Sequence, residues 1–393
     1  MLVWLSFFLS LGLILYLARK SLWLALIIGA LILGIFNLDF NTFLNITLNT
    51  ITSLPILLLA LAIGMIPLIG GGLQVSGLLG DLVNNLQMKR QVFLGFSPAL
   101  MGLLPIPGGA LLSAPMLHKA GDDISPESYA SINVWFRHML ILIYPLGAIL
   151  PCSKMADLNL YKVILYILPA FIILFLLGYF FFLFKIKGDM PSPSHIEIRK
   201  IVIPILIIVT APFIHIILSN TIFMDEISLL IGISASLLLT FFIGKLNLKI
   251  GKEIFLKMKP WKFFLIIIGI FLFLHVFQAS SISEKIALIV FSKNFLIIFI
   301  AFFLGFVTGR VQVPVSILLP IFLTKYGSIQ LTTLTFAIMY VAVYIGYMVS
   351  PVHPCVSVSV EYFQTKYLNF AGKFILPCLI GLGLTYLAAL ILI

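Results

Sequence analysis

Runs of about 20 apolar residues, almost free of charge, follow one another along most of this chain, and a helix of that length spans a bilayer. Apolar residues make up 62% of the sequence and charged residues only 9%, whereas soluble domains carry about 25% charged residues. So few charges cannot cover a water-facing surface around this much apolar mass. The sequence therefore predicts an all-α polytopic membrane protein and excludes a soluble enzyme.

Ten of the apolar runs are expected to cross the bilayer. They are 2–17, 21–38, 43–69, 129–150, 158–184, 200–218, 227–243, 262–278, 331–350 and 370–392. Two further stretches, 91–117 and 294–323, are interrupted near their middles by Gly, Pro and polar residues. We interpret them as re-entrant hairpins, because the cluster Pro105–Gly109 is too dense for a single kink. Two ordinary kinked spans are the alternative, since Gly and Pro are common in membrane helices.

The distribution of charge predicts the orientation. The chain carries 24 Lys and Arg against 13 Asp and Glu, a net charge of +11. These charges lie between the apolar runs, so we expect basic cytoplasmic loops and no nucleic-acid partner. With two re-entrant hairpins and an external N-terminus, the large majority of basic residues fall on the inner side. The sequence thus predicts a multi-pass protein of the cytoplasmic (inner) membrane of a prokaryote, with both termini outside.

The two interrupted stretches share one layout. Each has an apolar arm, a polar tip and a second arm with one proline, Pro115 or Pro320, and each precedes a long span that ends near Tyr144-Pro145 or Ser350-Pro351. Under the predicted topology they enter from opposite sides, which makes the two units an inverted repeat. The predicted organisation is an N-terminal helical pair (1–42), a first inverted-repeat unit (43–184) with hairpin 91–117, linking helices with a basic cytoplasmic loop (185–261), and a second unit (262–393) with hairpin 294–323.

Broken helices at membrane depth point to a binding site. Helix breakers leave backbone N–H and C=O groups without partners, and lipid cannot satisfy them, so these groups must face protein, water or a ligand. An inverted pair of such segments is typical of the binding site of a secondary transporter. We therefore expect the two tips to meet near the middle of the membrane.

The candidate substrate-binding residues lie at the two tips and in the spans that follow them. They are Pro107, Gly108, Gly109, Thr308, Gly309, Arg310, Gln312, Asn133, Arg137, His138, Ser350 and His353. A guanidinium inside a membrane is costly unless it is paired, and it can hold a carboxylate or phosphate through two hydrogen bonds. The alternatives are a snorkelling or structural role for the two arginines and a packing role for the two histidines.

The absence of acidic residues from the span interiors predicts the sign of the substrate. A cation pump that works through carboxylates needs Asp or Glu inside the membrane, whereas the excess here is Arg and His. We therefore expect a small anion as substrate and no cofactor. Coupling to sodium or to a proton is compatible with this reading, and hydroxyls at Ser97, Ser113 and Ser316 are the candidate ligands for a coupling cation.

Two strings carry a resemblance. Residues 104–115 read Leu-Pro-Ile-Pro-Gly-Gly-Ala-Leu-Leu-Ser-Ala-Pro, and residues 346–355 read Gly-Tyr-Met-Val-Ser-Pro-Val-His-Pro-Cys, followed by Glu361-Tyr362-Phe363. They resemble the signature regions of the prokaryotic ten-span family catalogued as domain of unknown function 401. That family is grouped in the ion transporter superfamily with citrate, gluconate, C4-dicarboxylate and arsenite carriers. The resemblance covers essentially the whole chain and implies a dimeric carrier with a scaffold part and a moving part that bears two hairpins.

The resemblance does not imply a substrate. Neither tip has the Ser-Asn-Thr triplet of the dicarboxylate carriers, so their ligand sets cannot be carried over. We expect a secondary active transporter of a small organic or inorganic anion, working by alternating access as a homodimer, and not an enzyme. The alternatives are an intramembrane enzyme acting on a lipid-linked phosphate, although no acid pair or metal-ligand cluster is visible in the sequence, and a passive anion channel.

Overall fold

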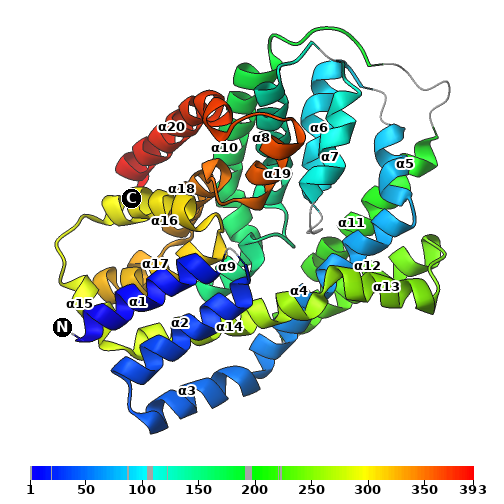
Figure 1. The fold of residues 1–393 in the computed structure, drawn as a ribbon. Helices are drawn as coiled ribbons and strands as arrows, with labels where there is room; N and C mark the ends of the chain where they lie inside the picture. The colour runs from blue at the N-terminus through cyan, green and yellow to red at the C-terminus, as the bar shows by residue number, and fades with distance from the viewer. Residues whose placement is uncertain are drawn as a thin grey trace.

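The computed structural model of the chain describes residues 2–18, 20–85, 88–103, 109–121, 123–190, 197–219, 221 and 224–393. These residues are nearly all helical and form no β-strand (Figure 1). Among them, seven helices are long and apolar enough to cross a membrane. The chain is therefore an all-α polytopic membrane protein, which confirms the fold class predicted from composition.

The helices fall into two halves of the same layout. The first half contains α1 (Leu2–Leu17), α2 (Leu22–Asn37), α3 (Phe40–Thr52), α4 (Leu54–Val75), α5 (Leu78–Asn84), α6 (Arg90–Gly102), α7 (Gly109–His118), α8 (Pro126–Ile143), α9 (Ile149–Met155), α10 (Leu160–Gly178) and the π-helical η1 (Tyr179–Leu183). The second half contains α11 (Ile198–Leu218), α12 (Asp225–Ile243), α13 (Leu248–Met258), α14 (Pro260–Ala279), α15 (Ser281–Ala287), the π-helical η2 (Phe295–Ile300), α16 (Ala301–Thr308), α17 (Gln312–Tyr326), the 3₁₀ turn η3 (Ser328–Gln330), α18 (Thr333–Val349), α19 (Pro354–Tyr362) and α20 (Tyr367–Leu392).

Corresponding helices of the two halves begin at nearly constant spacing along the chain. α4 begins at Leu54 and α14 at Pro260, and α8 begins at Pro126 and α18 at Thr333. The predicted organisation places residues 1–42 and 185–261 outside the two repeat units. The helix order shows that helices in these two segments correspond to each other. In the first half α1 and α2 precede α3 and α4, and in the second half α11 and α12 precede α13 and α14.

Two runs predicted as single spans are each divided into two helices. The run 43–69 breaks at Ser53, which is extended and directly precedes the start of α4, where Pro55 lies in the first turn. The run 129–150 breaks after Ile143, because Tyr144 is extended before Pro145 and the residue before a proline disfavours the helical conformation. Both predictions of an unbroken span were wrong, and in both cases a proline supplies the physical reason.

Both interrupted stretches form helix pairs whose open ends lie together. Arg90, at the start of α6, forms an ion pair with Asp123, just beyond α7. In the second pair, the Lys325 ammonium donates to the Ile289 carbonyl (2.6 Å) and the Tyr326 hydroxyl donates to the Phe291 carbonyl (2.9 Å). A helix pair that begins and ends at the same place is re-entrant. In Figure 1, α6 and α7 reach the centre of the molecule from the top of the view, and α16 and α17 reach it from the left.

The first arm of each hairpin crosses the next long helix at backbone contact. A Cβ atom on Gly102 of α6 would overlap the carbonyl oxygen of Arg137 in α8, and a Cβ atom on Gly305 of α16 would overlap that of Val343 in α18. Gly346 of α18 meets the carbonyl of Phe302 in the same way. Only glycine permits this separation. The two units therefore share a packing device as well as an order of helices.

The helices assemble into two bodies. The hairpin bundle consists of α6, α7, α8, α10, α16, α18, α19 and α20, in the upper part of Figure 1, and the frame consists of α1–α4 and α11–α14, in the lower part. Within the frame, α2 packs against α14 and α12 packs against α4, so the helical pair of each half lies on the long helix of the other half. The short helix α9 and the second hairpin arm α17 lie between the two bodies.

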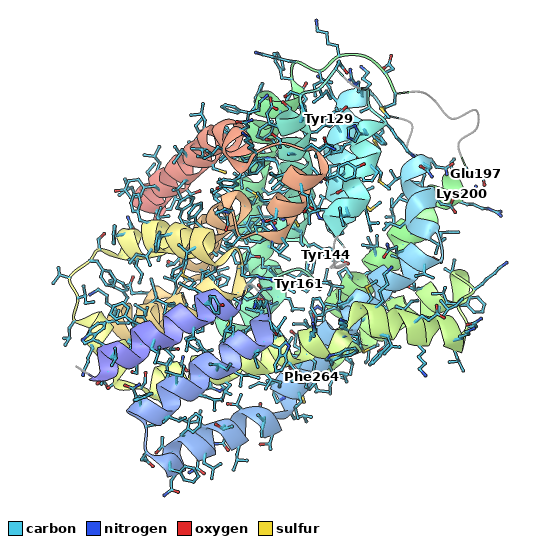
Figure 2. All side chains as sticks on the ribbon, viewed as in Figure 1. Tyr129, Tyr144, Tyr161, Glu197, Lys200 and Phe264 are labelled. Carbon is cyan, nitrogen blue, oxygen red and sulfur yellow. The ribbon has the colours of Figure 1, made fainter. Side chains whose placement is uncertain are left out.

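Polar contacts join the first unit to the frame on the predicted outer side. The Tyr144 hydroxyl donates to the Ile208 carbonyl (3.0 Å), and the Tyr161 hydroxyl lies 2.7 Å from Nδ1 of His215 (Figure 2). Lys154 of α9 pairs with Asp225 (2.7 Å) and Glu226 (2.6 Å) of α12. Partial burial lowers the pKa of the Lys154 ammonium, but its two carboxylate partners raise the pKa more, so the net shift is upward.

Candidate functional site

A cavity of about 520 Å³ lies where the two hairpin tips meet the frame. Its volume is within the range of small-molecule sites. The first hairpin contributes Gly102, Leu103, Gly109 and Ala110, and the second contributes Gly309, Arg310, Val311 and Gln312. The structure therefore brings the second tip and the described residues on both sides of the first tip to one cavity. Two predicted residues of the first tip, Pro107 and Gly108, lie outside the described residues.

The cavity has an apolar wall and a polar wall. The frame supplies the apolar wall, through Ile63 and Ile66 of α4 and Phe263, Ile266 and Ile267 of α14. The hairpin bundle and the tips supply the polar wall, with Arg137, His138, Arg310, Tyr347, His353 and Cys355. The two walls thus belong to different bodies of the protein.

Arg137 lies in α8 and holds the first hairpin. Its side chain is buried, and Nη1 donates to the Gly109 carbonyl at 3.0 Å. A Cβ atom on Gly109 would overlap Nη2 of Arg137, so glycine at the start of α7 admits the guanidinium. No carboxylate of the described residues pairs with Arg137. Arg137 therefore combines a structural hydrogen bond with an unbalanced positive charge.

Arg310 lies in the second tip itself. α16 ends at Gly309, whose φ of +57° is left-handed, and the hydroxyl of Thr308 accepts from the backbone N–H of Arg310 (3.3 Å). This arrangement turns the chain within three residues and places Arg310 on the cavity. Within the described part of the chain, its guanidinium has neither a hydrogen-bond acceptor nor a carboxylate partner.

Three helices begin at the cavity. The first residues of α7 (Gly109), α17 (Gln312) and α19 (Pro354) all line it. The free N–H groups at a helix N-terminus carry partial positive charge and favour anions. None of the described residues that line the cavity is Asp or Glu. The helix N-termini and the arginines therefore both make the electrostatic potential of the cavity positive.

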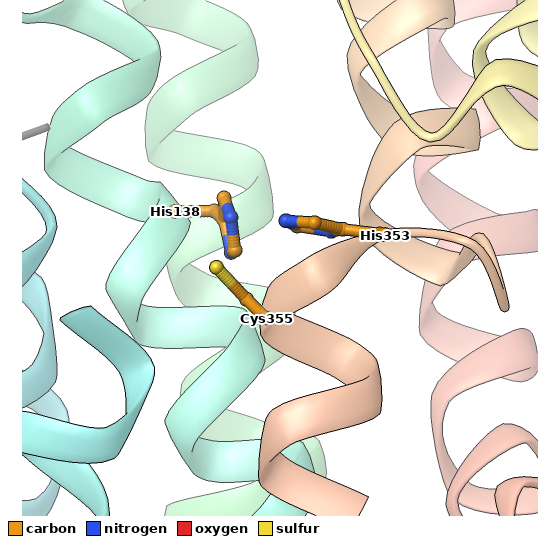
Figure 3. A group of neighbouring side chains, drawn as sticks. All are labelled: His138, His353 and Cys355. Carbon is orange, nitrogen blue, oxygen red and sulfur yellow. The ribbon is translucent and has the colours of Figure 1, made fainter. Parts of the chain in front are cut away.

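His138, His353 and Cys355 form a cluster on the polar wall (Figure 3). Their ligand-capable atoms all lie within 4.8 Å of one another. The rings of His138 and His353 are 4.7 Å apart between centroids, and the Tyr347 ring stacks on His353 at 4.0 Å. Sequence reasoning singled out the two histidines but missed Cys355 and Tyr347. The cysteine follows His353 by two positions, but its proximity to His138 is not readable from the sequence.

The other predicted residues lie outside the cavity lining of the described chain and take structural hydrogen bonds. Asn133 accepts from Ser113 (2.6 Å) and donates to Ser359 of α19 (3.0 Å), which links both units. The Ser350 hydroxyl accepts from the N–H of Val352 at the break between α18 and α19 (3.3 Å). Thr308 has the turn role already described.

The three serines proposed for a coupling cation do not bond to one another. Ser113 bonds to Asn133, Ser316 donates to the Val313 carbonyl (2.8 Å), and the buried Ser97 hydroxyl has no partner among the described residues. Their different partners give no sign of a shared oxygen cluster.

Comparison with known families identifies the chain at the level of its family. The model of a family described as "Protein of unknown function (DUF401)" matches residues 2–392. The chain belongs to the DUF401 family. No curated protein matches it. The match confirms the family resemblance carried by the two sequence strings, and the family description itself leaves the substrate open.

Proposed function

We propose that the protein is a secondary active transporter of a small organic or inorganic anion, working by alternating access. The observation that carries the proposal is the cavity between the hairpin tips, which holds two arginines and no described carboxylate. Uncompensated arginines are costly inside a membrane, and a bound anion would remove that cost. Three helix N-termini at the same cavity act in the same direction.

The division of the walls supports alternating access. Movement of one body past another requires a face that can slide without breaking polar contacts, and the isoleucines of α4 and α14 offer such a face. The polar wall lies on the bundle that carries the hairpins, so the anion would travel with the bundle. We further propose the cytoplasmic membrane of a prokaryote, external termini and a homodimer, which are the assignments expected from charge distribution and from the family.

The first experiment is a ligand screen with purified protein. Mono-, di- and tricarboxylates, phosphate and sulfate, each as sodium and potassium salts, are tested for a rise in melting temperature, since a ligand that binds only the folded state stabilises it. We expect one anion class to stabilise the protein. That anion is then tested in proteoliposomes for saturable uptake and for counterflow.

Arg310→Gln is the decisive variant, because the guanidinium has no structural partner in the described chain. We expect it to weaken anion affinity at least about tenfold, which corresponds to about 1.4 kcal/mol, and to leave the melting temperature without ligand close to wild type. Lys162→Gln, which removes an exposed positive charge from α10 outside the cavity, is the matched control and should bind normally. Wild-type transport by Arg310→Gln would contradict the proposal.

The same preparation separates the two alternatives. A channel gives uptake without counterflow, because it has no step in which a loaded site returns. An intramembrane enzyme converts a lipid-linked phosphate in detergent, where no gradient exists. Either result would replace the transporter assignment.

A further inference from the structure

Three side chains with metal-binding atoms converge on the wall of the cavity. We propose that His138, His353 and Cys355 form a binding site for a thiophilic metal ion, Cu⁺ or Zn²⁺. Their ligand-capable atoms lie within 4.8 Å of one another. The side chains point toward each other from α8, from the residue before α19 and from α19 itself (Figure 3).

The geometry needs only a small contraction to enclose an ion. Metal–nitrogen bonds of about 2.0–2.1 Å and metal–sulfur bonds of about 2.3 Å place neighbouring ligand atoms about 3.4–3.8 Å apart. Side-chain rotations of His353 and Cys355, which lie at the start of a helix after a break, can supply that movement. Two imidazoles and one thiol supply three ligands. A fourth coordination position would then face the cavity.

His138 is oriented for this role by the backbone. Its Nδ1 lies 2.5 Å from the Val134 carbonyl, and because a carbonyl oxygen can only accept, Nδ1 carries the proton. The lone pair of a neutral His138 is therefore on Nε2, which accepts a hydrogen bond from the Tyr347 hydroxyl (3.2 Å). A bound metal ion would take the place of this hydrogen bond. A hydrogen bond from one imidazole nitrogen to a carbonyl, with the other nitrogen left for the metal, is the usual arrangement around metal sites.

His353 provides a second, independent sign of a missing ligand. Its side chain is 1% exposed, and Nδ1 has no hydrogen-bond partner among the described residues. A buried polar atom without a partner is rare in folded proteins and requires an explanation. A metal ion bound by His353 together with His138 and Cys355 would supply the missing partner.

The chemistry of the site selects among metals. Thiolate and imidazole ligands favour Cu⁺ and Zn²⁺, whereas Na⁺, Mg²⁺ and Ca²⁺ need oxygen ligands, which this cluster lacks. Metal binding takes the thiol of Cys355, the second residue of α19, in its deprotonated form. A thiolate with Cu⁺ is neutral overall, so Cu⁺ adds no charge to a cavity that already contains two arginines. Zn²⁺ adds one positive charge, which an anion at the open position would balance.

The test is metal binding by the purified, metal-stripped protein in detergent. Co²⁺ replaces Zn²⁺ as a spectroscopic probe, and we expect one equivalent to produce a thiolate-to-cobalt charge-transfer band with visible bands of a four-coordinate ion. Zn²⁺ and, under reducing conditions, Cu⁺ are titrated against chromophoric chelators, and the tighter of the two identifies the preferred ion. Mg²⁺ should not compete.

Cys355→Ser and His353→Gln should each lower the affinity for both ions at least about 100-fold, and Cys355→Ser should abolish the charge-transfer band. Cys378→Ser, which removes a buried thiol of α20 away from the cavity, is the matched control and should retain the band. Melting curves without metal establish that each variant is folded, and His353→Gln serves if Cys355→Ser does not fold.

Equal metal affinity in wild type and in both site variants would overturn the site, and so would a charge-transfer band that depends on Cys378. The readout is spectroscopic and needs no transport. A failed metal titration therefore leaves the anion proposal standing, and a failed anion screen leaves the metal site standing.

Discussion

The two units deliver a positive charge to the cavity by different routes. In the first, Arg137 projects from α8 and is fixed by its hydrogen bond to Gly109 at the start of α7. In the second, Tyr344 occupies the same position in α18, and its hydroxyl donates to the His138 carbonyl (2.7 Å). The second arginine is instead Arg310, within the tip and without a described partner.

The two arginines therefore have different roles, although the sequence predicts the same role for both. A guanidinium held by the backbone shapes the site and is already partly satisfied, whereas one that has no partner keeps its hydrogen-bonding capacity for a ligand. We therefore expect stability to depend on Arg137 and anion affinity to depend on Arg310. The crossing glycines, by contrast, are alike in both units and should behave alike.

The largest effect is expected at those crossings. Gly102→Ala and Gly305→Ala each place a methyl group on a carbonyl oxygen of the neighbouring helix, and backbone cannot move aside as a side chain can. We expect each to cost at least about 3 kcal/mol of stability, measured by thermal melting in detergent. Gly383→Ala in α20 is the control, because a Cβ atom there meets nothing within 4 Å. Loss of folding in only one of the two variants would break the equivalence of the units.

The next effect contrasts the arginines directly. Arg137→Met loses the hydrogen bond that the guanidinium donates to the Gly109 carbonyl. Hydrogen bonds to charged groups contribute about 1.5–3 kcal/mol, so we expect a loss of that size. Arg310→Met should unfold at or above the wild-type temperature, because it removes an unpaired charge from the membrane interior. Melting curves without anion measure both. A destabilised Arg310→Met alongside an unaffected Arg137→Met would reverse the assignment of roles.

A smaller effect is expected at the short helices that follow the breaks. Lys154 of α9 pairs with the frame, whereas Ser359, at the same position of α19, bonds to Asn133 within the bundle. Lys154→Met leaves Asp225 and Glu226 side by side without a cation, and we expect a loss of about 1 kcal/mol. Adding Glu226→Gln should recover part of that loss in the melting temperature. No recovery would mean that packing, and not charge, is the contribution of Lys154.

The smallest effect on stability is expected at the open ends of the two hairpins, which are held together by different kinds of contact. The first hairpin is closed by the Arg90–Asp123 ion pair and the second by hydrogen bonds to backbone carbonyls. The hydrogen bond from Arg90 lowers the pKa of the exposed Asp123 carboxyl below its unfolded value. The Arg90–Asp123 ion pair therefore stabilises the fold at pH values above the unfolded pKa of Asp123. This stabilisation is lost as the pH falls through the pKa that Asp123 has in the folded protein. Asp123→Asn should flatten the acid side of the stability profile slightly, and Tyr326→Phe should not.

Much of the fold follows from local chemistry that the sequence displays. The lengths of the apolar runs predict the helices, and the density of Pro and Gly predicts the two hairpins. The break of the run 43–69 had a readable signal as well, because Ser53 and Pro55 are residues typical of a helix start. The repeat of α1 and α2 by α11 and α12 is visible only once helix order is known, since these pairs have no unusual residues in common.

The arrangement of the site exceeds what the sequence can predict. Every residue of α8 from Tyr129 to Met139 is buried, so no polar face indicates that Arg137 and His138 line the cavity while Asn133 bonds to Ser113 and Ser359. Cys355 and His138 are brought together by the packing of α19 on α8, which depends on tertiary contacts between the halves. The sequence places Arg310 in the second tip. That its guanidinium has no partner among the described residues can be learned only from the structure.

The reciprocal packing of α2 on α14 and of α12 on α4 has a consequence for biogenesis. The long helix of each half packs mainly against helices of the other half, so the first ten helices emerge from the ribosome before the residues that cover α4 have been synthesised. Membrane insertion must therefore precede assembly. Two separately translated fragments, divided between α10 and α11, would have to meet in the same membrane before either reached its native form.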